Sequence, residues 1–198
     1  MTYFSEVLWN RVFLSMTIKI LFVCHGNICR SPMAEFVMKK MVGESEELKA
    51  AGLSAADFEI ASAATSTEEI GNPVYPPAKR MLAAHGIDCS GKTARQMTAR
   101  DYEHYDYIIL MDENNRRNLR WILPTGTIAD ENSAQVTRNK TARNSSKISL
   151  LMDYTSHPRD VADPWYTGDF TATWNDVNEG CRGLLCEIIA QRLDRRPR

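Results

Sequence analysis

The stretch Cys24-His25-Gly26-Asn27-Ile28-Cys29-Arg30-Ser31 decides the fold, because it joins a predicted buried strand to a predicted helix. The apolar run at residues 18–23 precedes it. Residues 32–42 follow it, opening with a proline and repeating apolar side chains at helical spacing. The start of a helix carries free backbone N–H groups and partial positive charge. The loop between the strand and the helix is therefore predicted to bind an anion.

Strand-like and helical patterns alternate along the whole chain. Continuous apolar runs predict strands at residues 18–23, 58–63, 107–111 and 148–152. Helical spacing predicts helices at residues 32–42, 44–57 in part, 76–85, 113–122 and 170–193. This alternation predicts a single α/β domain, with a doubly wound four-stranded parallel sheet flanked by helices on both faces. Ligands of such sheets bind at the carboxyl ends of the strands, where Cys24 and Asp112 lie.

The composition is that of an ordinary globular protein. The 198 residues suit one domain, and a formal net charge of −1 argues against a dedicated nucleic-acid binder. No apolar run approaches the roughly 20 residues that span a bilayer. Five cysteines without a disulfide pattern indicate a reducing compartment, so a cytoplasmic location is expected.

Two segments are expected to lie outside the core of the main domain, which covers residues 16–198. Residues 1–15 lack the features of a signal peptide and are expected to be an N-terminal extension. Residues 124–147 are rich in Thr, Asn, Ser, Ala and Arg and almost free of apolar side chains, so they predict a surface insertion.

The loop residues suit nucleophilic attack on phosphorus. The positive field of the helix start favours the thiolate of Cys24, which is the nucleophilic form. Arg30 offers a planar donor fork that matches phosphate oxygens, and Ser31 could donate a hydrogen bond to the thiolate. Gly26 and Asn27 tolerate the backbone geometry of a tight loop. The predicted phosphate-binding set is the whole loop: Cys24, His25, Gly26, Asn27, Ile28, Cys29, Arg30 and Ser31. A packing role for a buried strand-end cysteine is the alternative for Cys24.

A phosphoester that is cleaved in this way also needs a proton donor for its leaving oxygen. Asp163 is the candidate, because Pro164 would stiffen the loop that aims its carboxylate. Trp165 and Tyr166 would form an aromatic wall that suits a flat substrate ring. Composition alone leaves three other carboxylates in competition for the role of acid: Asp112, Asp160 and Asp169.

From about residue 17 to residue 193 the chain resembles the low-molecular-weight protein-tyrosine phosphatases. The resemblance is carried, in order, by Val23-Cys24-His25-Gly26-Asn27-Ile28-Cys29-Arg30-Ser31-Pro32, Ser62-Ala63-Ala64-Thr65, Ala94-Arg95-Gln96, Tyr107-Ile108-Ile109-Leu110-Met111-Asp112 and Asp163-Pro164-Trp165-Tyr166. It implies that Cys24 is the nucleophile, that Arg30 binds phosphate and that Asp163 is the proton donor. It also implies hydrolysis of phosphotyrosine through a phosphocysteine, without a metal or other cofactor.

Departures from the family pattern concern the surroundings of the loop. Ala64 replaces a usual glycine, and Lys92 stands where a histidine is common. Glu68 stands where an aromatic residue is often found, so it is grouped with the predicted substrate wall. Cys29 matches the family's second loop cysteine, which can form a protective disulfide with the nucleophile, and is a redox candidate; a small packing residue is the alternative.

Three other functions are compatible with parts of the sequence. Gly86-Ile87-Asp88-Cys89-Ser90-Gly91-Lys92-Thr93 fits a nucleotide-binding pattern, but it follows a predicted helix instead of a strand, which favours a chance match. Thiol-dependent arsenate reduction on the same fold needs relay cysteines, and Cys181 and Cys186 do not share a helix face. Related phosphoarginine phosphatases carry threonine at the position of Ile28, so the resemblance implies phosphotyrosine instead.

The expected partners follow from this interpretation. They are phosphotyrosine-containing proteins or small aryl phosphates, with no nucleic acid and no membrane. The chain is expected to be a monomer or a weak homodimer. No metal site is predicted, because the histidines show no ligand spacing with the cysteines: His25, His85, His104 and His157.

Overall fold

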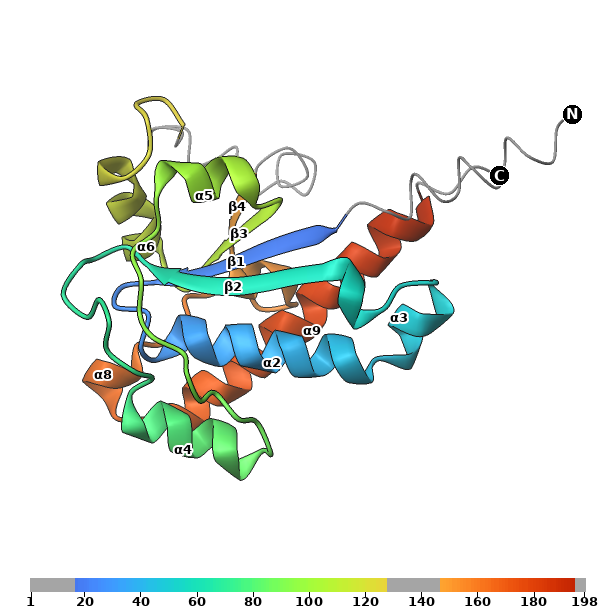
Figure 1. The fold of residues 1–198 in the computed structure, drawn as a ribbon, viewed down its shortest axis with the longest axis horizontal. Coiled ribbons are helices and arrows are strands. Elements are labelled where there is room, and N and C mark those ends of the chain that lie inside the picture. The colour runs from blue at the N-terminus through green and yellow to red at the C-terminus, as the bar shows by residue number, and fades with distance from the viewer. Residues whose placement is uncertain (1–16, 128–146, 195–198) are drawn as a thin grey trace, which may run out of the picture.

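The computed structural model describes residues 17–127 and 147–194. Four strands form one parallel sheet in the order β2-β1-β3-β4. Their bounds are β1 Ile18–Cys24, β2 Phe58–Ala64, β3 Tyr107–Leu110 and β4 Ile148–Leu150. Helices cover both faces of this sheet, which confirms the predicted doubly wound α/β fold (Figure 1). The predicted N-terminal extension, and residues 128–146 of the predicted insertion, lie outside the described residues.

The strand order places Cys24 at the centre of one edge of the sheet. The chain runs from β1 to β2 on one side, and then to β3 on the other side of β1. Cys24 pairs in register with Ala64, and Val23 pairs with Leu110, so the carboxyl ends of these strands lie side by side. Ligands of doubly wound sheets bind at this point, where the strand order reverses.

One face of the sheet is covered by α2 and α9, and α4 packs against these two helices on the side away from the sheet (Figure 1). Helix α2 spans Arg30–Glu44 and packs against β1, β2 and α9, which spans Phe170–Asp194. Helix α4, Pro76–Ala84, opens with a proline whose fixed φ suits a first helical turn. The short helix α3, Glu46–Ala50, is followed by the 3-10 turn η1, Ala55–Asp57. The main apolar core lies between these helices and the sheet.

The opposite face is covered by α5, Ala99–His104, by α6, Glu113–Asn118, and by the 3-10 turn η2, Leu119–Trp121 (Figure 1). Thr98 and Asp101 form a capping box that starts α5. A second apolar cluster is buried on this face, and it includes Leu21, Val23, Ile108, Leu110 and Leu119. No helix in the two described ranges is long and apolar enough to cross a bilayer.

Several boundaries differ from the expected ones. The predicted helix at residues 113–122 ends at Asn118 and continues as η2. The predicted strand at residues 148–152 ends at Leu150, because the next four residues form the 3-10 turn η4, Leu151–Tyr154, which Asp153 stabilises by accepting the Leu150 N–H at 3.3 Å. Helix α5 and the short α8, Pro164–Thr167, were not expected, since neither has a helical apolar pattern of its own.

Candidate active site

Cys24 ends β1, and its thiol lies beside the start of α2. The residue is only 3% exposed, and its Sγ lies 3.0 Å from the hydroxyl oxygen of Ser31. The backbone N–H of Asn27 donates to the same sulfur at 3.3 Å. Both contacts stabilise negative charge on sulfur, as does the positive end of α2, whose first residue is Arg30. The end of β1 therefore places the sulfur among groups that attract anions.

The loop between β1 and α2 is fixed by donors from neighbouring segments. Three backbone N–H groups donate to loop carbonyls at 2.8 to 3.0 Å: Thr65 to Cys24, Ser66 to His25 and Tyr75 to Ile28. Asn27 adopts a φ of 58°, a left-handed conformation that asparagine tolerates better than most residues. The loop carbonyls face these donors, whereas the Asn27 N–H faces the sulfur. Loops whose carbonyl groups point outward and whose N–H groups point inward form concave anion-binding sites.

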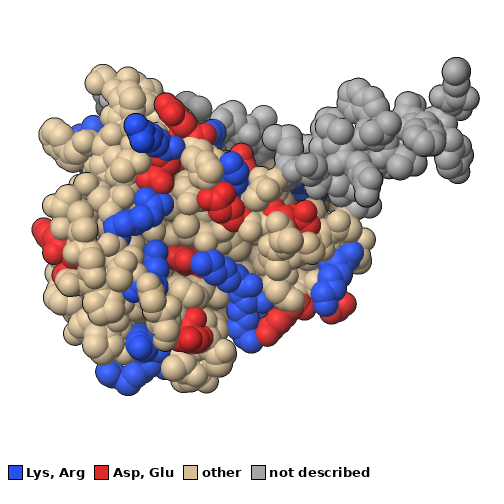
Figure 2. Space-filling model, in the orientation of Figure 1, with Lys and Arg blue, Asp and Glu red and all other residues tan. Residues whose placement is uncertain are grey.

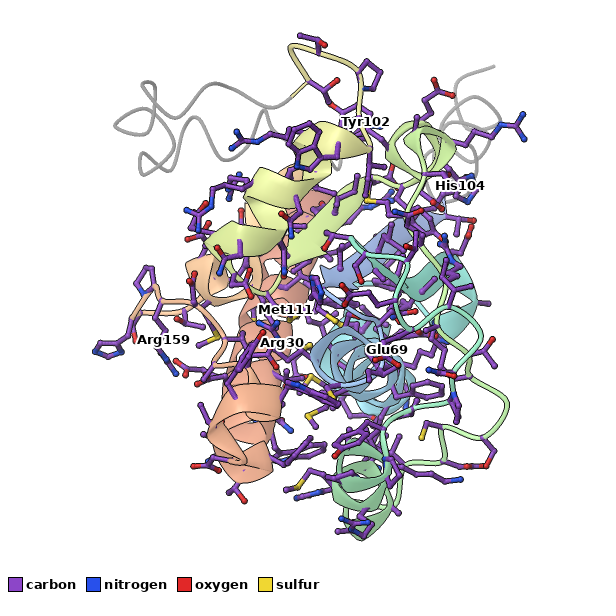
Figure 3. The ribbon with its side chains drawn as sticks, turned by 90° about the vertical axis from the view of Figure 1, so that its left-hand side faces the viewer. Arg30, Glu69, Tyr102, His104, Met111 and Arg159 are labelled. Atoms are coloured by element: carbon purple, nitrogen blue, oxygen red, sulfur yellow. The ribbon has the colours of Figure 1, made fainter. Side chains whose placement is uncertain are left out.

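Arg30 is almost completely buried and holds two carboxylates at once. Its Nη1 donates to Asp112 at 2.5 Å and to the Val161 carbonyl at 3.1 Å, and its Nη2 donates to Asp163. Burial alone would lower the pKa of Arg30, but negative charge on Cys24, Asp163 and Asp112 raises it above its ordinary value. The guanidinium therefore stays charged. It lies near the centre of this end of the molecule (Figure 3).

The two carboxylates on Arg30 are held in different ways. Asp163 precedes α8, where one oxygen accepts the Trp165 N–H at 3.0 Å and the other pairs with Arg30. Asp112 caps α6 by accepting the Asn115 N–H at 2.6 Å, and its second oxygen pairs with Arg30. The side chain of Asp163 is 23% exposed and that of Asp112 is 12% exposed. Asp163 is therefore the more accessible of the two.

The other two competing carboxylates bind backbone N–H groups. Asp160 accepts the Glu113 N–H at 3.3 Å, and Asp169 accepts the Ala172 N–H at 2.8 Å near the start of α9. Burial, followed by the nearby charge of Asp112, raises the pKa of Asp160. Asp169 has the ordinary role of a residue at a helix start.

The predicted wall residues lie on the surface. Trp165 is 55% exposed and Tyr166 is 85% exposed, and Trp165 packs on the ring of Tyr75 with centroids 5.2 Å apart. Exposed aromatic side chains next to Asp163 are available to a ligand. Glu68 is also exposed, and it pairs with the exposed loop residue His25 at 3.0 Å.

A chain of buried polar side chains runs beneath the loop, and the sequence analysis did not identify it. Asn27 donates to the hydroxyls of Ser31 and Ser62 at 2.9 and 2.7 Å, and Ser62 donates to Glu35 at 2.6 Å. Lys92 pairs with Glu35 at 3.0 Å. One sequence feature could have revealed this chain: Glu35 is a charged residue among the apolar side chains of α2, next to Ala34 and close to Met38, which are both buried in the core.

Cys29 lies directly before α2 and is 6% exposed. Burial, followed by negative charge at Cys24 and Asp163, raises the pKa of Cys29 to about 12. At neutral pH this cysteine is therefore a protonated thiol and a poor nucleophile. Both Cys24 and Cys29 are free thiols in this structure.

The nucleotide-binding pattern at residues 86–93 does not form a phosphate loop. It follows helix α4, whereas the motif requires a preceding strand. Its lysine, Lys92, is paired with Glu35 and donates to the Ser62 carbonyl at 3.1 Å, so it is not aimed at an open loop.

The other cysteines and histidines form no second site. Cys181 is fully buried in α9, where its thiol contacts the Ala34 carbonyl at 3.7 Å. Cys186 is exposed on the same helix. In the described ranges, no three His, Cys, Asp or Glu side chains gather as metal ligands would.

Comparison with known proteins agrees with this geometry. The family model described as "Low molecular weight phosphotyrosine protein phosphatase" matches residues 19–127 and 127–196. The chain is 37% identical over 172 residues to the human protein of that name, covering 85% of this chain and 94% of that one. It is 35% identical over 177 residues to the low molecular weight protein-tyrosine-phosphatase YfkJ of Bacillus subtilis, covering 88% and 98%.

The fold matches equally well. The crystal structure of YfkJ from Bacillus subtilis superposes with a TM-score of 0.70 at 33% identity, covering 89% of this chain and 98% of that chain. The fold and the matching relatives thus define the enzyme class, a protein phosphatase that acts on phosphotyrosine. The chain belongs to the low molecular weight phosphotyrosine protein phosphatase family.

Proposed function

We propose that this protein is a phosphatase that hydrolyses phosphotyrosine in proteins and small aryl phosphates, through a phosphocysteine at Cys24. Family membership supports the reaction class. The observation that carries the proposal is the environment of the sulfur, which lies 3.0 Å from the Ser31 hydroxyl, accepts the Asn27 backbone N–H and lies in the same loop as a buried arginine. A packing cysteine has no need of these three groups.

Substrate binding would begin with an exchange of partners at Arg30. In the free protein the guanidinium pairs with Asp163 and Asp112. A phosphate dianion in the loop offers stronger, bidentate acceptors to the same fork. Asp163 then leaves Arg30 and lies next to the leaving oxygen of the substrate, where its carboxyl group can act as the acid. Asp112 keeps the guanidinium in place.

Two displacements complete the reaction. In the first, Sγ of Cys24 attacks phosphorus, the bond from phosphorus to the tyrosine oxygen breaks, and Asp163 gives its proton to that oxygen. In the second, Asp163 takes a proton from a water molecule that attacks phosphorus, and the bond from phosphorus to sulfur breaks. Ser31 stabilises the thiolate before it attacks and again as it departs in the second step, and inorganic phosphate is released. Neither step needs a metal or other cofactor.

The surroundings of the loop support an aromatic substrate. We assign Trp165, Tyr166 and Glu68 to the wall of the substrate site, because they are exposed beside Asp163 and the loop. Ile28 supports phosphotyrosine over phosphoarginine, as the family resemblance implies. We further infer that residues 16–198 form the phosphatase domain, with residues 1–15 and 124–147 as additions to it.

The cellular setting is also inferred. A cytoplasmic enzyme that acts as a monomer or weak homodimer fits the cysteine usage and the charge balance. Lys and Arg are intermixed with Asp and Glu on the face of the molecule in Figure 2, so no broad basic surface for nucleic acid is present there.

The decisive test compares Cys24→Ser with the unchanged protein. The unchanged protein is expected to release phosphate from a phosphotyrosine peptide and from p-nitrophenyl phosphate. Cys24→Ser is expected to release none, while it still binds inorganic phosphate in a calorimetric titration. A phosphoarginine peptide and arsenate with a thiol reductant are assayed beside them. Faster turnover of either one than of phosphotyrosine would replace the proposed function.

A further inference from the structure

The backbone in front of Asp163 is attached to the sheet and to Arg30. The Val161 N–H donates to the Met111 carbonyl at 2.8 Å, one residue beyond the end of β3. The Val161 carbonyl in turn accepts from Nη1 of Arg30 at 3.1 Å. Val161 is 1% exposed, so both contacts are shielded from water. Met111 and Arg30 lie together near the centre of this end of the molecule (Figure 3).

The next residue, Ala162, is attached to α9 through one hydroxyl group. Oγ1 of Thr173, which is fully buried, lies 3.2 Å from the Ala162 carbonyl and 3.2 Å from the Asp169 carbonyl and donates its hydrogen to them. These two carbonyls stand at the two ends of the segment that carries Asp163 and α8. A single side chain of α9 therefore closes the base of this segment.

Of the two carbonyls, the one that depends on this hydroxyl is that of Ala162. A threonine in a helix commonly donates to the carbonyl four residues earlier, which here is that of Asp169. The Asp169 carbonyl also accepts the Thr173 backbone N–H at 3.3 Å, so it keeps a donor if the hydroxyl is removed. Within the described part of the chain, the Thr173 hydroxyl is the donor that reaches the Ala162 carbonyl.

The backbone of Asp163 itself is fixed by the start of α8. Its carbonyl accepts the N–H groups of Tyr166 and Thr167, each at 3.1 Å. One oxygen of its side chain accepts the Trp165 N–H at 3.0 Å, and the other pairs with Arg30. With the backbone held on both sides, the torsions of the Asp163 side chain are what can carry its carboxyl group from Arg30 to the leaving oxygen of a substrate.

We propose that Thr173 is a positioning residue for Asp163, and that its hydroxyl fixes the backbone from which the Asp163 carboxyl group acts. The inference rests on the proposed role of Asp163 as the proton donor. The Ala162 carbonyl and the Asp163 nitrogen belong to one planar peptide unit. If the carbonyl loses its buried donor, it turns toward solvent, to which Ala162 is exposed. That rotation changes the φ of Asp163 and so re-aims its carboxyl group.

The test compares Thr173→Val, which keeps the shape of the side chain but cannot donate, with Thr173→Ser, which keeps the donor. Thr155→Val is the matched control, because the Thr155 hydroxyl also donates to a backbone carbonyl, that of Met152 at 2.8 Å, outside residues 162–169. The readout is kcat/KM for phenyl phosphate and for p-nitrophenyl phosphate. Of these two substrates, phenyl phosphate has the poorer leaving group and depends more on the acid.

Thr173→Val is expected to lower kcat/KM for phenyl phosphate about fivefold, the equivalent of one neutral hydrogen bond, and that for p-nitrophenyl phosphate by less than about twofold. Thr173→Ser should restore the ratio of the two values to that of the unchanged protein. Thr155→Val should leave this ratio unchanged, whatever it does to stability. Equal losses for both substrates in Thr173→Val, or a serine variant that behaves like the valine variant, would overturn the proposal.

Asp163→Ala separates this inference from the proposed function. Added to Asp163→Ala, Thr173→Val should change neither kcat/KM by more than about twofold, because no acid is left to position. If Asp163→Ala alone lowers both values equally, the acid role and this inference both fail. If Asp163→Ala shows the selective loss but Thr173→Val does not, or if the two losses add in the double variant, only the positioning role is overturned. Should Thr173→Val not fold, Thr173→Ala replaces it with the same expectations.

Discussion

The close approach of α9 to η4 at Gly183 predicts that Gly183→Ala destabilises the fold. Gly183 lies in α9 against the 3-10 turn η4, and a Cβ on it would lie 2.1 Å from the Tyr154 carbonyl oxygen and 2.9 Å from its carbon. The gap to the oxygen must widen to at least 3.0 Å. The obstacle is backbone, so no rotamer change relieves it. Overpacking of this kind costs about 1–3 kcal/mol, whereas alanine gains about 1 kcal/mol of helix propensity over glycine.

The net expectation is a loss of about 0–2 kcal/mol in the free energy of unfolding, which is about 1–3 kcal/mol less than for a helix alanine that meets no obstacle, measured by urea denaturation. Gly43→Ala in α2 is the matched control, because a Cβ there meets nothing within 4 Å. It should leave stability unchanged or raise it by up to about 1 kcal/mol. If Gly183→Ala is as stable as Gly43→Ala, the close approach of α9 to η4 is refuted.

Three further predictions concern the site. Asp163→Ala should slow phenyl phosphate hydrolysis far more than p-nitrophenyl phosphate hydrolysis, because a good leaving group needs less proton donation; equal losses in steady-state assays would remove Asp163 from the role of acid. Asp112→Asn keeps the oxygen that caps α6 but removes the charge on Arg30. For Asp112→Asn we expect weaker inhibition by phosphate and a kcat/KM for p-nitrophenyl phosphate that is about tenfold lower. An unchanged inhibition constant for phosphate would contradict this expectation. Oxidation of Cys24 removes the negative charge that helps to keep the Cys29 thiol protonated, so Cys29 can then trap the oxidised Cys24 as a disulfide. Cys29→Ser should therefore make inactivation by hydrogen peroxide irreversible to dithiothreitol, and full recovery of activity would exclude the redox role of Cys29.

The sequence predicted the sheet and the loop well for a physical reason. The two inner strands, β1 and β3, are buried on both faces, so they are nearly continuous apolar runs that differ clearly from the helices around them. The loop residues from Cys24 to Ser31 are adjacent in the chain, and therefore their meeting at the end of β1 needs no long-range information. The same holds for the Asp163–Pro164 turn at the start of α8.

Local sequence patterns could not predict contacts between segments that are far apart in the chain. Asp112 looked like one of several possible acids, and only the fold shows that it pairs with Arg30 from the end of a neighbouring strand. Glu35 and Lys92 are 57 residues apart by their numbering, and no local pattern joins them. Helix α5 was missed because its stability depends on a capping box and not on an apolar stripe, since none of its residues is buried.

In the proposed mechanism, Arg30 explains how one edge of the sheet can serve both phosphate binding and proton transfer. A buried arginine needs acceptors at all times, since an unpaired buried charge is costly. In the free protein Asp112 and Asp163 supply them. In the proposed mechanism phosphate replaces Asp163, which precedes the short α8 and is the more exposed of the two, while Asp112 keeps its place as the cap of α6. Binding of phosphate and release of the proton donor are then one event in that mechanism, and a variant that kept Asp163 on Arg30 is expected to bind phosphate less tightly and to donate no proton.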